Sequence, residues 1–408
     1  MSDIARTVDA VWRIEGAQIV ATLARVTGDF SLAEDLAQEA VVDALAQWPQ
    51  SGVPRNAGAW LTAVAKRKAI DRWRRDERLS DRYRALALNF DEADESLWQP
   101  IDDDILRLIF TACHPVLSKE SQVALTLRIV AGMSAAEIAR MLLVPVATVQ
   151  QRIVRAKKTL TASKVPFETP EPREWSERLG SVLGVVYLLF TEGYAATAGD
   201  RWLRRELADE ALRLGRMVSA LLPREPEALA LVALMELQAS HFGARTASDG
   251  TPILLADQDR SRWDRAQIQR GRAALRQADA LGRGRGSYGL QAAIAECHAV
   301  AGSVETTDWD LIVLCYEALC RLAPSPIVEL NRAVAVSMAT GPAAALAIVD
   351  ELDGDGALRG SHLLPSIRGE LLARLGRTEE ARSELRVAAS LCRNDQTRAV
   401  LEVKAASL

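Results

Sequence analysis

Three polar residues in the stretch AEDLAQEAVVDAL (residues 33–45) have the spacing of one helical face. Asp35, Gln38 and Glu39 stand at positions i, i+3 and i+4, and residues with this spacing are neighbours on a helix surface. Val42 continues the same face, while the rest of the helix is mostly aliphatic. Two carboxylates and an amide gathered on one side of a helix are a candidate functional face.

A strongly basic helix is expected after this one. The segment 66–84 holds nine basic and four acidic residues. Basic side chains beside Trp60 and Trp73 can follow a phosphate backbone and stack on unpaired bases, although each Trp taken alone is more often a core residue. The candidate nucleic-acid contacts of this helix are Trp60, Lys66, Arg67, Arg72, Arg74 and Arg75.

A second basic segment, 152–164, holds five basic residues and no acidic one. Its apolar positions Val149, Ile153, Ala156 and Leu160 have helical spacing, so Gln and Arg side chains fall on the opposite face. Such a helix can present these side chains to base edges in the major groove. The candidate contacts are Thr148, Gln150, Gln151, Arg152, Arg155 and Lys158.

The elements that position these side chains carry start and stop signals. Ser31 and Glu34 form a predicted capping box, so the first helix is expected from Ser31 to about Trp48, before Pro49. The basic helix is expected from about Ala59. Ser134 and Glu137 form a second predicted capping box, and Val144-Pro145 marks the turn before the last basic helix, which together give helix-turn-helix spacing.

Charge distribution is more informative here than net charge. The formal net charge of −4 gives no hint of nucleic acid, but residues 91–104 hold seven acids and no Lys or Arg between the two basic segments. An acidic, poorly periodic segment does not fold alone, so we expect a linker. The alternative for both basic segments is a solvated helix face, and for the linker a solubilising tether.

At this point the sequence resembles a known family. GDFSLAEDLAQEAVVDAL followed by AWLTAVAKRKAIDRWRR is similar to region 2 of the extracytoplasmic-function sigma factors of bacterial RNA polymerase, and TVQQRIVRAKKTL is similar to the helix-turn-helix of their region 4. The two matches stand in the family's order and separation. One departure is Arg67, where family members usually have Asn.

The resemblance implies partners and roles. Asp35, Gln38 and Glu39 match the positions with which the family grips the coiled coil of the polymerase clamp, and region 4 is expected at the β flap. The basic helix of region 2 is implied to read and melt the −10 promoter element, and the region 4 helix to read the −35 element. A promoter-specific, non-enzymatic initiation factor without a cofactor is therefore expected.

The chain continues for some 240 residues beyond region 4. Pro226 and Pro326 lie in similar segments, and residues 372–391 resemble a tetratricopeptide (TPR) helix pair, which predicts a helical repeat; a plain helical bundle is the alternative. The family has a subgroup with such an extension, which is associated with small YCII-related proteins. The predicted divisions are region 2 (1–86), acidic linker (87–104), region 4 (105–163), linker (164–174) and a TPR-like domain (175–408).

Composition agrees with an all-α protein, because Ala, Leu and Arg are abundant and aromatics few. Five scattered Cys without a CxxC pair indicate a reduced, cytoplasmic protein. The longest apolar run, 179–190, is 12 residues and too short for a bilayer, which needs about 20, so no membrane association is expected. The net acidic extension is predicted to pack on regions 2 and 4 and to regulate them.

Two further clusters contain chemically versatile side chains. Asp257, Asp259, Arg260 and Trp263 form a candidate ligand or partner site, and an ordinary interhelical loop is the alternative. The pairs Cys113-His114 and Cys297-His298 have no spacing typical of zinc ligands, so no metal is expected.

Three other functions compete with the sigma-factor interpretation. A stand-alone helix-turn-helix regulator with a TPR-like partner-binding domain would not need the Asp35 face or the Trp-rich basic helix. A TPR-type scaffold would not need intact basic residues in both segments. An enzyme is disfavoured by four His, no Gly-rich phosphate loop and no nucleophile motif.

Overall fold

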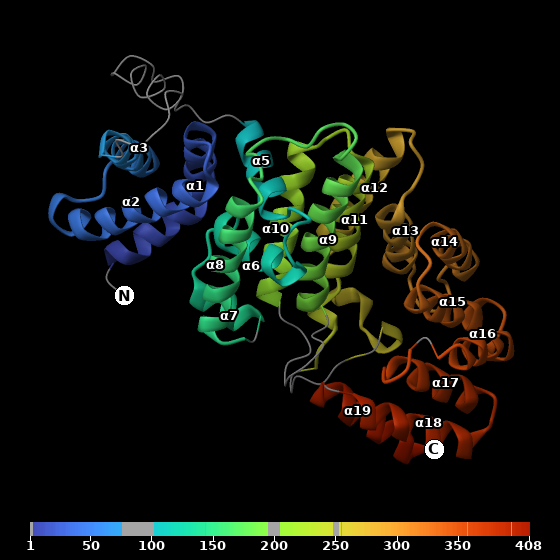
Figure 1. Cartoon of the computed structure of the whole chain (residues 1–408). Helices are drawn as coiled ribbons and strands as arrows, with labels where there is room; N and C mark the ends of the chain where they lie inside the picture. Colours follow the sequence, from blue (N-terminus) through green and yellow to red (C-terminus); the bar gives the residue numbers. More distant parts are fainter. Residues whose placement is uncertain are drawn as a thin grey trace. The chain divides into compact units, whose positions relative to one another are not determined.

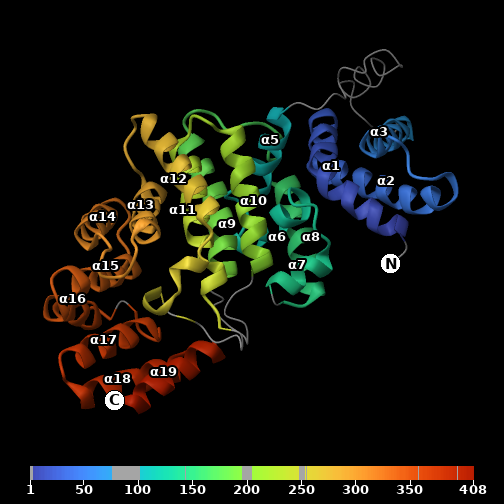
Figure 2. The same ribbon diagram turned by 180° about the vertical axis from the view of Figure 1, so that it is seen from behind.

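The computed structural model confirms the all-α prediction. Its described part contains eighteen α-helices, three short 3-10 helices and no β-strand. The chain divides into two compact units, Met1–Val185 and Val186–Leu408, which are described separately below (Figures 1 and 2). The described residues are 3–75, 102–142, 144–194, 205–247, 253, 255–356, 358–392 and 394–408. Most of the predicted acidic linker, 87–101, therefore lies outside them.

The first unit begins with three helices packed on one another: α1 (Asp3–Thr27), α2 (Phe30–Ser51) and α3 (Ala57–Arg75). Their shared core contains Leu23, Leu36, Trp48 and Leu61, which are all fully buried. The core forms because each helix carries an apolar stripe at 3.6-residue spacing. The basic side of α3 and the polar side of α2 are thereby held on one small scaffold.

The predicted capping box at the start of α2 is wrong. The N-cap is Asp29, whose side-chain oxygen accepts a hydrogen bond from the Leu32 amide at 3.1 Å. The N-cap lies two residues before the predicted Ser31 because Phe30 belongs to the buried core and Asp is as good a cap as Ser. Glu34 is thus free of any capping role, and its side chain is buried.

The end of α2 also differs from the prediction. Pro49 lies inside the last turn, and the helix continues to Ser51. A proline this close to the end removes one intrahelical bond, and the turn is closed by Gly52, whose amide donates to the Trp48 carbonyl at 3.0 Å. Gly52 adopts φ +80°, a conformation that favours glycine.

Four further helices complete most of the first unit: α5 (Asp102–Ala112), α6 (Lys119–Ile129), α7 (Ala135–Leu142) and α8 (Val146–Ala162). The second predicted capping box is confirmed. The Glu137 amide donates to Ser134 Oγ at 3.2 Å, and the Ser134 amide donates to Glu137 Oε2 at 2.9 Å. Pro145 stands at the N-cap of α8, so α7 and α8 form the expected helix-turn-helix.

Helix α9 (Trp175–Tyr194) passes from the first unit into the second. In the second unit, neighbouring helices in the sequence pack on one another from α10 to α19, including α11 and α12, which are joined by a loop with three 3-10 helices (Figures 1 and 2). The helices are α10 (Arg205–Leu221), α11 (Pro226–Ala239), α12 (Arg265–Ala280), α13 (Ser287–Val300), α14 (Trp309–Leu322), α15 (Pro326–Ala339), α16 (Pro342–Gly354), α17 (Leu363–Arg374), α18 (Thr378–Leu391) and α19 (Asp395–Ser407).

Local features of the second unit agree with the repeat seen in the sequence. Pro226 and Pro326 each open a helix at its first turn. The close approach of α17 and α18 depends on small residues, because a Cβ on Gly369 would lie 3.2 Å from the Ala381 carbonyl oxygen. Helices that contact mainly their sequence neighbours are typical of helical repeats, while assignment to the TPR class remains a prediction.

None of the described helices has both the length and the apolar character that a membrane span requires.

Two glycines of the first unit provide a matched test of its packing. Gly28 and Gly132 have φ +66° and +69°, but only a Cβ on Gly132 would meet another helix, at 3.2 Å from the Arg13 Cα atom of α1. We expect Gly28→Ala to lower the free energy of unfolding by about 1 kcal/mol through backbone strain. Gly132→Ala should cost about 2 kcal/mol or more, because it adds overpacking.

The measurement is urea unfolding of both variants, followed by amide hydrogen exchange in α1 and α6. Equal losses for the two variants would contradict the close approach of the α6–α7 turn to α1.

Candidate protein and nucleic-acid interfaces

Two of the three polar residues on the predicted face of α2 are exposed, and the third is half-buried. The side chains of Asp35 and Glu39 are 60% and 52% exposed. Gln38 is half-buried, and its Nε2 atom is buried without a hydrogen-bond partner in the described structure. Val42 and Leu45 continue the face as exposed apolar side chains. The surface thus offers two carboxylates, an amide and an apolar margin.

A lysine of α3 lies beside this face. Lys68 Nζ is 3.0 Å from Asp43 Oδ2 and 3.5 Å from Glu39 Oε2. The hydrogen bond with Asp43 raises the pKa of Lys68 above its usual value, so the lysine is cationic. Because these groups are partly exposed, the pairs hold α2 and α3 together only weakly.

Helix α3 separates an apolar side from a basic side. Leu61, Ala65 and Ala69 are buried. Trp60 is half-buried, with its ring 5.4 Å from that of Trp48 in an edge-on arrangement. Packing on the core therefore uses one part of the Trp60 indole. Lys66 is half-buried and Arg67 and Arg72 are exposed, while the side chains of Trp73, Arg74 and Arg75 lie outside the described structure.

Helix α8 has the two faces that its sequence predicts. Val149, Ile153, Ala156 and Leu160 are all buried. On the other side, Gln150, Gln151, Arg155 and Lys158 are exposed, and Thr148 and Arg152 are half-buried. A groove of about 440 Å³ runs between the start of α6 and α8, and Arg152 and Arg155 line it. The six candidate side chains thus lie on the surface of α8 that is not buried in its core, hereafter the exposed flank of α8.

Glu34 is a feature that the sequence did not reveal. Its side chain is 6% exposed and contacts Lys157 of α8 directly, while Arg128 of α6 approaches it at 3.6 Å. Lys157 Nζ also donates to Asp35 Oδ1 at 2.8 Å. Burial lowers the pKa of Lys157, but the charges and hydrogen bonds of both carboxylates outweigh it and leave the pKa above its usual value. Lys157 is therefore cationic.

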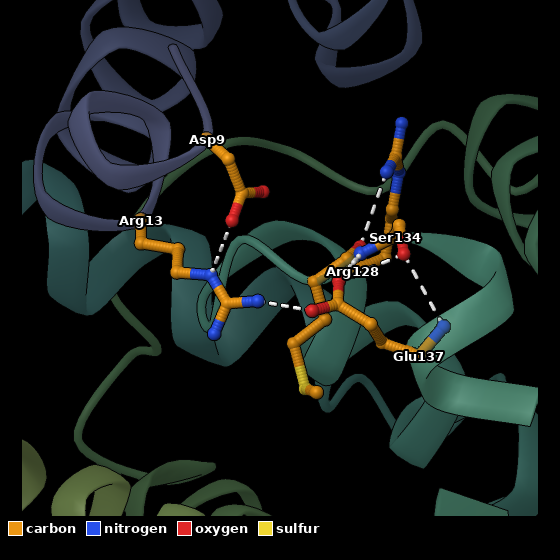
Figure 3. A network of polar contacts seen from close by, with 6 residues as sticks. Asp9, Arg13, Arg128, Ser134 and Glu137 are labelled. Atoms are coloured by element: carbon orange, nitrogen blue, oxygen red, sulfur yellow. Dashed lines mark hydrogen bonds and ion pairs between the residues drawn. The ribbon is translucent and has the colours of Figure 1, made fainter. Parts of the chain in front are cut away.

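Two more ion pairs join the first three helices to α5–α8. Arg13 of α1 contacts Glu137 at the start of α7 as well as Asp9 on its own helix (Figure 3). Arg25 of α1 donates to Asp104 of α5 at 2.7 Å, and the Asp104 side chain is fully buried. Hydrogen bonds from Ser134 and the charge of Arg13 hold the pKa of Glu137 below its usual value, against the opposing effect of its burial.

The first part of α9 packs on α5 and α6 within the first unit. Ser181 Oγ donates to the Cys113 carbonyl at 2.8 Å, and Gln122 Nε2 donates to Ser181 Oγ at 3.2 Å. Arg178 donates to the Phe110 carbonyl at 3.0 Å. The segment Trp175–Val185 therefore contacts α5 and α6 of region 4, as the sequence predicts for the start of the extension; for the rest of the extension this packing remains a prediction.

The structure brings together two residues of the candidate ligand site in the second unit, because the Arg260 guanidinium lies over the Trp263 ring at 4.8 Å. Trp263 is 3% exposed and packs with Leu237 and Ile268. Arg260 donates to the carbonyls of His298 at 2.8 Å and Ala301 at 2.7 Å. These two residues fasten the loop to the helices.

The two acids of that cluster, Asp257 and Asp259, lie on the 3-10 helices of the same loop. Asp259 caps the 3-10 helix η4 (Arg260–Arg262) by accepting from the Ser261 amide at 2.9 Å, and Asp257 is exposed at the end of η3 (Leu255–Asp257). The alternative of an ordinary interhelical loop accounts for these contacts.

The cysteines beside His114 and His298 are buried free thiols. Burial raises the pKa of Cys113 and of Cys297 to about 11. Among the described residues, no group of three or more His, Cys, Asp or Glu is placed to hold an ion.

Comparison with known proteins follows the same division of the chain. Residues 13–79 match the Sigma-70 region 2 family and residues 107–160 match Sigma-70, region 4. Residues 178–279 match a family of unknown function, DUF6596. An uncharacterized protein of Rhizobium meliloti (strain 1021), R00370, is 43% identical over 393 residues, which cover 95% of this chain and 92% of the relative.

The two sigma matches fall on the helices that carry the polar face of α2, the basic side of α3 and the exposed flank of α8. Proteins of this kind are not enzymes; they bind core RNA polymerase and promoter DNA, and the polymerase performs the chemistry. The chain belongs to the extracytoplasmic-function type of sigma factors, which direct promoter recognition, and it carries a C-terminal domain after region 4.

Proposed function

We propose that Asp35, Gln38 and Glu39 form the surface with which this sigma factor binds the coiled coil of the polymerase clamp. The observation that carries the proposal is the exposure of two carboxylates beside Val42 and Leu45 on one helix that is anchored by its opposite side. Such a face combines charge complementarity to a basic helix with an apolar contact.

Promoter contacts are proposed for the other two surfaces. The −10 element is contacted by six residues of α3: Trp60, Lys66, Arg67, Arg72, Arg74 and Arg75. The −35 element is contacted by six residues of α8: Thr148, Gln150, Gln151, Arg152, Arg155 and Lys158. The exposure of Arg155, Gln150 and Gln151 supports base readout, because such side chains make paired hydrogen bonds to guanine and adenine. The basic side of α3 supports phosphate contacts.

The C-terminal domain is proposed to regulate this activity. Support comes from the contacts of Trp175–Val185 with α5 and α6 and from the match of residues 178–279 to the DUF6596 family. The similar segments at Pro226 and Pro326 support a TPR-like repeat in this domain, and the scattered cysteines support action in the cytoplasm. Binding of a small YCII-related protein by the repeat and of the β flap by region 4 is proposed from the family resemblance.

The docking surface is tested by Glu39→Ala, which removes an exposed carboxylate. We expect affinity for core polymerase to fall about ten-fold, equivalent to about 1.4 kcal/mol, with no change in the circular dichroism spectrum or the unfolding midpoint. Glu168→Ala is the matched control, since it removes an exposed carboxylate that lies outside region 2 and beyond α8. Fluorescence anisotropy with labelled core measures both. Unchanged affinity for Glu39→Ala, or equal losses in the two variants, would contradict the assignment.

The promoter readers are distinguished by their effect on sequence preference. We expect Arg155→Ala to weaken holoenzyme binding to the promoter by about 1–3 kcal/mol and to relax preference at one position of the −35 element. Arg72→Ala should weaken binding to all sequences similarly, because phosphate contacts carry no base information. The measurement is a filter-binding series on promoters selected in vitro with the holoenzyme.

Arg173→Ala is the control for the promoter readers, because this arginine is exposed and lies outside both of them. A footprint that stops short of the −35 region would exclude the role given to α8.

Regulation by the extension is tested by ending the chain after Tyr194, which keeps the buried contacts of α9 with α5 and α6. We expect promoter-dependent run-off transcription to change. A rise indicates inhibition by the domain and a fall indicates positive control. A truncated protein that folds and transcribes like the full chain would refute a regulatory role.

A further inference from the structure

Three separate ion-paired contacts fasten the helices of region 2 to those of region 4. They are Arg13 with Glu137, Arg25 with Asp104, and the cluster of Glu34, Asp35, Arg128 and Lys157, hereafter the α2–α8 cluster. We propose that the α2–α8 cluster is an autoinhibitory contact, which holds regions 2 and 4 closed on each other in the free protein and competes with core polymerase for α2.

The burial of the cluster shows that it is a formed interface. Glu34 is 6% exposed and Lys157 is 15% exposed at the side chain. A carboxylate this deeply buried needs a cationic partner, since removing one partner of a buried pair is strongly destabilising. In an open form of region 2, water would have to replace Lys157 around Glu34. The ion pairs of the α2–α8 cluster therefore favour the closed form over the open form. They add little to the free energy of unfolding of region 2 or of region 4 by itself.

Competition follows from a shared carboxylate. Lys157 Nζ lies 2.8 Å from Asp35 Oδ1, and Asp35 is one of the carboxylates to which we assign polymerase docking. A groove of about 490 Å³ beside it is lined by residues of both α2 and α8, including Ser31, Asp35, Lys157 and Thr161. A basic helix of the polymerase that approaches Asp35 would meet α8 and the charge of Lys157. This step rests on the proposed docking function.

Promoter geometry also requires the contact to open. Elements named −35 and −10 are about 25 base pairs apart, or roughly 85 Å of duplex at 3.4 Å per base pair. Helices α2 and α8 have 22 and 17 residues, so they span about 33 and 26 Å at 1.5 Å per residue. Even end to end they reach only about 59 Å, and α3 packs beside α2. The closed form cannot place α3 and α8 on both elements together.

Most of the recognition flank of α8 does not take part in the closing contact. Gln151 and Arg155 are exposed in the closed form, whereas Lys157 and Thr161 face α2. Of the six −35 candidates, Lys158 lines the groove beside Asp35. The contact thus controls access to polymerase and the separation of the readers, and leaves most of the −35 surface open.

A reversible covalent lock tests the proposal in the full chain. Ser31 Oγ and Thr161 Oγ1 are 3.4 Å apart, close enough for a disulfide of about 2.05 Å after small side-chain shifts, and neither residue is assigned to docking or DNA. We expect Ser31→Cys/Thr161→Cys to form the disulfide under mild oxidation. Its affinity for core polymerase should then fall at least about 50-fold and return to the wild-type value when the disulfide is reduced.

The single variants Ser31→Cys and Thr161→Cys are the controls for oxidation of the five native cysteines. A second variant tests the ionic part: Lys157→Met should raise affinity for core polymerase about five-fold, because apparent affinity increases with the open fraction. The same change added to the double-cysteine variant should slow disulfide formation. Lys164→Met, at an exposed lysine just beyond α8, should have neither effect.

Two results would overturn the closing contact. One is failure of the disulfide to form in the full chain, and the other is wild-type polymerase affinity in a protein whose disulfide is verified by mass spectrometry. Failure of the docking proposal gives a different result: Glu39→Ala would bind core like the wild type, while the yield of the disulfide would still report whether regions 2 and 4 close on each other.

Discussion

The buried carboxylate of Glu34 is the constraint around which the first unit is arranged. A charge that is nearly excluded from water is tolerated only with cations at close range, and those cations, Lys157 and Arg128, come from region 4. The start of α2 must therefore face α6 and α8 whenever this arrangement is populated. The other pairs, Arg25 with Asp104 and Arg13 with Glu137, support the same approach from α1. Gly132 permits it sterically, because its turn lies against the α1 backbone.

Helix α8 has three sides, and each side faces a different environment. Val149, Ile153, Ala156 and Leu160 face its own small core, Gln151 and Arg155 face solvent, and Lys157 faces α2. At 100° per residue these sets occupy different sectors of the helix. A change at Lys157 can therefore alter closure without altering the base-reading side chains, which makes closure and promoter sequence preference separable properties.

The second unit depends on local packing instead of a single distant contact. Its helices pack mainly on their sequence neighbours, and buried charge is again matched at close range: Glu236 of α11, 1% exposed, accepts from Arg216 of α10 at 2.9 Å and from Arg270 of α12 at 3.2 Å. In the loop between α11 and α12, burial lowers the pKa of His241 to about 3, so this imidazole is neutral beside Trp263. The loop that first suggested a ligand site is thereby a fixed part of the core.

The sequence alone determined the helical class, the capping box at Ser134, the buried stripe of α8 and the family, because each depends on residues a few positions apart. It misjudged Glu34 and Gln38. Ser31 and Glu34 have capping-box spacing, but Phe30 is drawn into the core, the helix starts at Asp29, and Glu34 turns toward a lysine 123 positions away. The closing of region 2 on region 4 was decided only by tertiary structure. Local periodicity fixes which face of a helix is polar, whereas the partner of that face depends on which distant helix the fold brings beside it.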